Sequence, residues 1–218
     1  MNKNKWMSFF GFSAVCFFAG CAWHPGGLTS LDAQTEAVVR SSFRPEGIVK
    51  LDALDTDETN RLCSAAAVRA EPLDEDTARR IEAENFNSIV MPPNGQFIGD
   101  WRKGEIIAQS GRGLTFSDNG KSPNGGNCYN CHQIDKKEIA YGTIGPSLFN
   151  YGKIRGVQDP NSADSRPIVE YTWRKIWNAK GFNACSNMPR VGHKGILSPE
   201  QIADVMALLL DPKSPVNQ

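Results

Sequence analysis

The chain has 218 residues and carries 24 basic and 24 acidic side chains, so its formal net charge at pH 7 is zero. This length is enough for one domain, or for one domain with an extension. The neutral balance gives no reason to expect a nucleic-acid partner, because such partners select for a basic surface. No run of about eighteen or more apolar residues follows the N-terminal region, so we expect no transmembrane helix in the mature protein.

Residues 1–20 are predicted to form a signal peptide, because two lysines precede a mostly apolar run that ends at Phe18. The stretch Phe18-Ala19-Gly20-Cys21 resembles a lipobox, after which Cys21 would carry a lipid and become the new N-terminus. A lipobox usually has Leu, Val or Ile at the position of Phe18, and ordinary cleavage near Ala22 is the alternative. Both interpretations predict export to the periplasm, and the first adds a lipid anchor.

Residues 21–98 are predicted to form an N-terminal extension. We expect residues 22–56 to be loop or extended arm, because they are punctuated by Gly and Pro and show no sustained period. A helix is expected from an Asp57 cap to about Ala70, and a second from Asp74 or Asp76 through Phe86. The Pro-Pro-Asn-Gly stretch at 92–95 indicates a linker. The extension is net acidic, whereas residues 99–218 are net basic.

The predicted domain at 99–218 contains the pentapeptide Cys128-Tyr129-Asn130-Cys131-His132, which matches C-x-x-C-H, the attachment motif of c-type haem. Both cysteine sulfurs would form thioethers with haem vinyl groups, and His132 would bind the iron from one side. A thioredoxin-like or zinc C-x-x-C is the alternative. A zinc site needs a second ligand pair at similar spacing, which the sequence lacks. One covalently bound haem c is therefore expected, and its attachment outside the cytoplasm agrees with export.

The stretch Gly145-Pro146-Ser147-Leu148 follows the motif and resembles a feature of the cytochrome c fold. In that fold the carbonyl oxygen of the proline accepts a hydrogen bond from the iron-binding histidine. Such a bond fixes the tautomer and makes the other ring nitrogen a stronger ligand. We assign this role to Pro146, with a plain turn as the alternative.

Met188 is predicted to be the second axial ligand of the iron, because it lies in a loop beside Pro189 and Met/His ligation is common in electron-carrying cytochromes c. Met206 lies on the apolar face of a predicted helix, where a core role fits better. His193, among Gly and Lys, and Met91, ahead of the domain, are the other candidates.

The remaining pattern predicts an all-α domain. Residues 100–109 are expected to form a helix capped by Asp100, and residues 169–179 a helix with an aromatic face. Ser198, Pro199 and Gln201 predict a capping box at the start of the last helix, which in cytochromes c crosses the first.

Several stretches together resemble SoxX, the monohaem subunit of the SoxXA sulfur-oxidation cytochrome. They lie at residues 126–132, 141–148, 151–156, 185–190 and 208–212, and the likeness extends over about 60–214. The resemblance implies a heterodimer with a SoxA-like haem subunit. That complex is an L-cysteine S-thiosulfotransferase, which couples thiosulfate oxidatively to a cysteine of the SoxYZ carrier. This chain would contribute no catalytic residue, and would pass electrons from its haem to another cytochrome c.

Cys63 and Cys185 are predicted to form a disulfide. Cys16 lies in the signal, Cys128 and Cys131 are assigned to haem, and Cys21 is lipidated or removed. The two remaining cysteines would meet in an oxidising compartment, where thiols tend to pair. Two buried free thiols are the alternative.

Two other functions are compatible with a single C-x-x-C-H motif. A free-standing electron carrier has no need of the long extension. An enzyme acting at its own haem would need an open iron or a second haem, and the sequence has one C-x-x-C-H.

Overall fold

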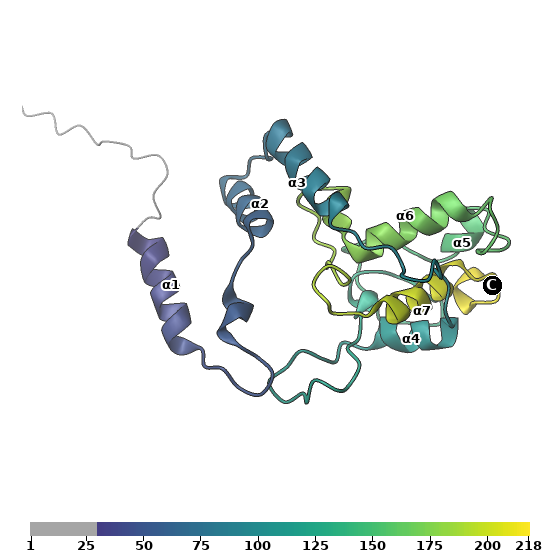
Figure 1. The fold of residues 1–218 in the computed structure, drawn as a ribbon, viewed down its shortest axis with the longest axis horizontal. Helices are drawn as coiled ribbons and strands as arrows, with labels where there is room; N and C mark the ends of the chain where they lie inside the picture. The colour runs from purple at the N-terminus through teal and green to yellow at the C-terminus, as the bar shows by residue number, and fades with distance from the viewer. Residues whose placement is uncertain (1–29) are drawn as a thin grey trace, which may run out of the picture. The chain divides into compact units, whose positions relative to one another are not determined.

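The computed structural model describes residues 30–218, so the predicted signal peptide and Cys21 lie outside the described residues. The described chain is all-α and contains no β-strand; an isolated bridge joins Glu46 and Val49. Two units are distinguished, one ending at Ser42 and the other spanning Phe43–Gln218. Figure 1 shows the order of the helices along the chain.

The first unit contributes one described helix, α1 (Ser30–Ser42). The expectation of loop or arm over residues 22–56 is therefore wrong for this segment. The segment is rich in helix-forming residues, and Arg40 Nε lies 3.0 Å from Glu36 Oε1, one turn away. The described side chains of α1 are almost all exposed, so the helix buries no apolar face. A helix of this kind needs no apolar period, which is the signal that would have indicated it in the sequence.

The second unit begins with helices that match the predicted extension. A short 3₁₀ turn, η1 (Leu51–Leu54), precedes α2 (Glu58–Arg69) and α3 (Glu75–Asn87). Asp57 and Asp74 cap these two helices, since each side chain accepts a backbone N–H bond at 2.9 Å. The Asp57 cap was predicted, and of the two candidates for the second helix, Asp74 and Asp76, the cap is Asp74.

The remaining helices belong to residues 99–218. They are α4 (Trp101–Gln109), η2 (Cys128–Asn130), α5 (Tyr151–Ile154), α6 (Arg166–Trp177), η3 (Ala179–Gly181), α7 (Pro199–Leu210) and η4 (Pro215–Asn217). Helix α6 begins three residues before the predicted start, because Pro167 fits the first turn of a helix. It ends at Trp177, and the predicted continuation to residue 179 enters η3 instead. The capping box of Ser198 and Gln201 is present.

Helices α4 and α7 lie side by side (Figure 1), as predicted for the first and last helices of this domain. A Cβ atom on Gly104 would lie 2.1 Å from the Asp204 carbonyl oxygen, so the two backbones approach closely only because this residue is glycine. Asp204 Oδ1 also accepts the Asp100 N–H at 2.7 Å. The crossing thus fixes the start of α4.

The core surrounds α7, which packs against both α4 and α6. Trp173, Met206 and Leu208 are fully buried in it, and the Trp173 ring meets Phe97 edge to face. The Trp173 indole N–H donates to the Val90 carbonyl at 3.0 Å, so the linker after α3 is also attached to this core. The predicted aromatic face of α6 is buried as expected.

Helix α3 is attached to the segment after α6 by polar bonds as well as by packing. Asn178 is fully buried, and its amide donates to Asn85 Oδ1 at 3.0 Å. The Ala184 N–H donates to Glu82 Oε1 at 3.0 Å. The extension therefore packs against the segment that leads into residues 182–198, the loop between η3 and α7 that contains Met188 and is called the Met188 loop below.

Candidate haem site

The motif cysteines lie on one tight turn, η2. The backbone N–H groups of Cys131 and His132 both donate to the Cys128 carbonyl, at 3.1 and 2.9 Å. Ahead of the turn, Asn127 takes a left-handed backbone conformation, with φ of 53°. The Gly126 N–H donates to the Ile107 carbonyl at 2.8 Å, which joins the motif to α4. The turn keeps both cysteine side chains and His132 in one short loop, as haem attachment requires.

His132 is held by the loop that follows the motif. Its Nδ1 lies 2.7 Å from the Pro146 carbonyl oxygen. Because that oxygen only accepts, Nδ1 carries the proton and Nε2 is left with its lone pair for a metal. A Cβ on Gly145 would lie 2.2 Å from His132 Cε1, so the backbone of this loop is in direct contact with the imidazole ring. The role assigned to Pro146 matches this geometry.

Met188 lies in the loop between η3 and α7, where it is half-buried and packs against the hydrophobic core. The other candidates occupy different surroundings. Met206 is fully buried within α7, and Met91 packs beside the core from the linker. His193 is exposed, with Nδ1 3.1 Å from Ser88 Oγ. Met188 as the axial ligand remains a prediction, and its surroundings agree with it.

The Met188 loop is attached to α2 by a covalent bond and by an ion pair. Cys63 and Cys185 form the predicted disulfide, with their Cα atoms 5.4 Å apart. Two residues after Met188, the buried Arg190 side chain forms an ion pair with Asp57, the cap of α2. Lys194 Nζ lies 2.9 Å from the same carboxylate. The segment from 185 to 190 is therefore fixed at both ends.

Burial alone would raise the pKa of Asp57. The hydrogen bonds from Asn60, Lys194 and Arg190 outweigh it and hold the pKa well below its usual range. The ion pair is therefore charged throughout the neutral range.

Sequence reasoning missed a buried polar group beside the motif. Glu105 Oε1 accepts from the Tyr129 hydroxyl at 2.9 Å and from Gln109 Nε2 at 2.6 Å. Its Oε2 is buried and has no hydrogen-bond partner within residues 30–218. Burial raises the pKa of Glu105, and burial together with Glu105 raises the pKa of Tyr129 well above its usual range. The sequence offered no signal for this pair except a tyrosine inside the motif.

The residues present fit a haem. The ring of His132 leaves one nitrogen available, and Cys128 and Met188 both pack against the same hydrophobic core. The buried Trp177 indole N–H has no acceptor in the described part of the chain, and a haem propionate would supply one. The zinc alternative gains no support, since the described residues contain no cluster of three or more His, Cys, Asp or Glu that would hold a metal ion.

Comparison with known proteins defines the class. Residues 116–212 match the family model of cytochrome c. A protein of Aquifex aeolicus (strain VF5), described as an uncharacterized lipoprotein, is 39% identical over 164 residues, which cover 74% of this chain and 73% of that protein. The chain therefore contains a cytochrome c domain. Across residues 30–218, no helix is both long and apolar enough to cross a membrane.

The cytochrome c domain indicates haem-based electron transfer. When bound, haem c supplies an iron centre that accepts and releases one electron at a time. Cys128 and Cys131 would hold it covalently, and His132 and Met188 would bind its iron. The part of the protein is then to fix these side chains and to exclude water around them.

Proposed function

We propose that this chain is the electron-transfer subunit of a SoxXA-type complex and carries one covalently bound haem c. The complex would couple thiosulfate to a cysteine thiolate of a SoxYZ carrier, forming a sulfur–sulfur bond and releasing two electrons. This chain would accept those electrons singly and pass them to another cytochrome c. Its class as an enzyme would be that of a subunit of an L-cysteine S-thiosulfotransferase, without a catalytic residue of its own.

The observation that carries the proposal is the attachment of α2 to the Met188 loop. A disulfide, the Asp57–Arg190 ion pair and the Glu82 bond to Ala184 join the extension to the segment around Met188. An axial methionine and histidine leave no open iron position, which favours electron transfer over chemistry at the iron. The five stretches that resemble SoxX, including this loop at 185–190, support the particular complex.

The alternative is a free-standing monohaem carrier in the periplasm. The haem-attachment motif at 128–132 is compatible with such a carrier. A carrier that works alone, however, has no need of two helices fixed to the Met188 loop. Size-exclusion chromatography distinguishes the two functions. The mature haem-loaded chain, co-expressed with the SoxA-like haem subunit of its own organism, is expected to elute as a heterodimer.

A second arm tests the reaction. Adding thiosulfate and SoxYZ to the oxidised heterodimer should reduce the haem of this chain, whereas adding them to this chain alone should not. A chain that elutes alone in every mixture and stays oxidised would contradict the SoxXA proposal and favour the carrier.

We also propose that the mature protein is extracytoplasmic and anchored through a lipid on Cys21. The lipobox-like stretch at 18–21 supports this, as does the lipoprotein description of the Aquifex relative. Labelled palmitate should enter the wild-type protein and not Cys21→Ser. Clean recovery of unlabelled wild-type protein from the periplasm would exclude the anchor.

A further inference from the structure

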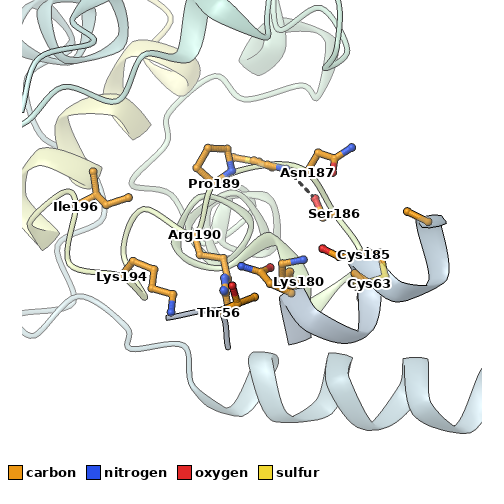
Figure 2. A pocket seen from close by; sticks show the side chains of 14 residues that line it. Thr56, Cys63, Lys180, Cys185, Ser186, Asn187, Pro189, Arg190, Lys194 and Ile196 are labelled. Atoms are coloured by element: carbon orange, nitrogen blue, oxygen red, sulfur yellow. Dashed lines mark hydrogen bonds between the residues drawn. A yellow bond between two sulfur atoms is a disulfide. The ribbon is translucent and has the colours of Figure 1, made fainter. Parts of the chain in front are cut away.

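A cavity of about 750 Å³ lies between α2 and the Met188 loop. Thr56, Asn60 and Ser64 line it from the side of α2, and Ser186 and Met188 line it from the loop. Figure 2 shows the disulfide of Cys63 and Cys185 at one side of this hollow. None of the residues of the haem-attachment motif lines the cavity, and Met188, the predicted iron ligand, borders it from the loop.

The charged side chains that line this cavity are all basic. They are Lys180, Arg190 and Lys194, and Figure 2 shows them around the same hollow. Lys180 and Arg190 are buried, with exposed fractions of 6% and 7%, whereas Lys194 is largely exposed. Burying a cation costs desolvation free energy unless a negative group lies beside it.

The one nearby carboxylate among the described residues that pairs with these cations is Asp57, which accepts from both Arg190 and Lys194. Lys180 has no ion-pair partner within residues 30–218. Its Nζ donates to the Ala184 carbonyl at 3.2 Å, a neutral acceptor, and an ammonium group has three N–H donors. Burial, with the charge of Arg190, lowers the pKa of Lys180. The cavity therefore has more positive charge than Asp57 neutralises.

We propose that this cavity binds a small divalent oxyanion, with Lys180 as the principal ligand and Lys194 at the rim. A divalent oxyanion provides the missing negative charge, and its several oxygens match the N–H donors of Lys180 together with the hydroxyls of Thr56 and Ser64. The proposal does not depend on the SoxXA assignment. A haem propionate has related carboxylate chemistry, and if it occupied these donors, no free anion would bind to the haem-loaded protein.

The test uses the mature haem-loaded chain and sodium sulfate as the probe. Isothermal titration calorimetry is run at constant ionic strength, with sodium chloride as the balancing salt. Saturable binding of sulfate is expected for the wild type. Lys180→Gln should weaken it about tenfold or more, because a charge-assisted hydrogen bond is lost. Lys194→Gln, a milder change at the rim, should weaken it less, and Lys213→Gln, outside the cavity, should not change it.

Thermal unfolding and the haem spectrum establish that each variant is folded. If Lys180→Gln does not fold, Lys194→Gln alone must weaken binding relative to Lys213→Gln. Absence of saturable binding to the wild type, whether from an empty cavity or from a propionate already on Lys180, would overturn the proposal. Equal affinity in Lys194→Gln and Lys213→Gln, with Lys180→Gln unchanged or unfolded, would overturn it as well.

Discussion

At the scale of single residues, Glu105 links protonation to stability. Burial raises its pKa above the ordinary value of 4.5. Between the ordinary pKa of the unfolded chain and the raised pKa of the folded protein, folded Glu105 keeps a proton that the unfolded chain has released. The free energy of unfolding therefore falls as pH rises through this window, and remains lower above it.

Glu105→Gln should remove this penalty, since the amide oxygen still accepts from the Tyr129 hydroxyl while the charge is gone. We expect higher stability than the wild type at pH 7 and a flatter stability profile above pH 4.5. Urea unfolding of the haem-loaded protein at a series of pH values measures this. Glu71→Gln, at an exposed position, is the control, and identical profiles for the two variants would contradict the account.

Gly145 is a second residue whose role depends on contact geometry. Gly145→Ala would place Cβ 2.2 Å from His132 Cε1, so the ring or the loop must move. We expect loss of the Nδ1 bond to Pro146, a destabilisation of about 1–3 kcal/mol, and a shifted reduction potential. Ser147→Ala, two residues further on, is the control. A Gly145→Ala protein with the stability and potential of that control would show that the ring is not fixed by this loop.

At the scale of elements, the Cys63–Cys185 disulfide joins α2 to the Met188 loop. It closes a loop of 122 residues, so by chain entropy its contribution is on the order of 4–5 kcal/mol. The double variant Cys63→Ser and Cys185→Ser should lose much of this and bind methionine to iron less firmly, since the loop then moves more freely. Chemical unfolding and the methionine–iron absorption band measure the two effects.

Thiol titration of the denatured, unreduced wild-type protein checks the bond itself. With Cys128 and Cys131 in thioethers and Cys21 blocked or absent, no reactive thiol is expected. About two reactive thiols per chain would contradict the disulfide.

The cap of α2 gives a prediction in which charge and capping are separated. Asp57→Ala removes the cap and leaves the buried Arg190 without its carboxylate, whereas Asp74→Ala removes only the cap of α3. Loss of a cap costs about 1 kcal/mol. We therefore expect Asp57→Ala to be clearly more destabilising than Asp74→Ala in urea unfolding at pH 7.

The lowered pKa of Asp57 sets the sign of its pH dependence. Its stabilisation is complete above the ordinary value of 3.8 and is lost as pH falls towards the lower folded value. The difference between wild type and Asp57→Ala should shrink below pH 3.8. Equal costs for the two alanine variants at pH 7 would mean that the Arg190 pair contributes nothing.

Elements with strong local signals were predictable, and those that depend on contacts were not. The caps at Asp57 and Ser198 were predicted, and the cap of α3 was narrowed to Asp74 or Asp76, because capping is local. Helix α1 lacked an apolar face, so nothing in its pattern distinguished it from a loop. The Glu105–Tyr129 bond and the Asp57–Arg190 pair join residues far apart in the chain, and only the fold brings them together. The haem motif and the disulfide could be predicted from the sequence because their chemistry restricts the type and number of the residues involved.

At the scale of the whole molecule, the helices α2 and α3 fix the loop that carries Met188 in a chain with a cytochrome c domain. Residues 43–218 form one compact unit that includes both the helices α2 and α3 and the haem motif. The division proposed from the sequence, with an extension at 21–98 and a domain at 99–218, stays a prediction. In this arrangement the bonds from α2 restrict the movement of the loop that carries Met188.

The most direct test of this account is the near-infrared absorption band of the methionine–iron(III) bond in the oxidised, haem-loaded protein. The wild type should show the band. Met188→Ala should lose it while keeping the covalent haem, and Met206→Leu, in the core of α7, should keep it. Persistence of the band in Met188→Ala would contradict the central assignment, and so would its absence from the wild type.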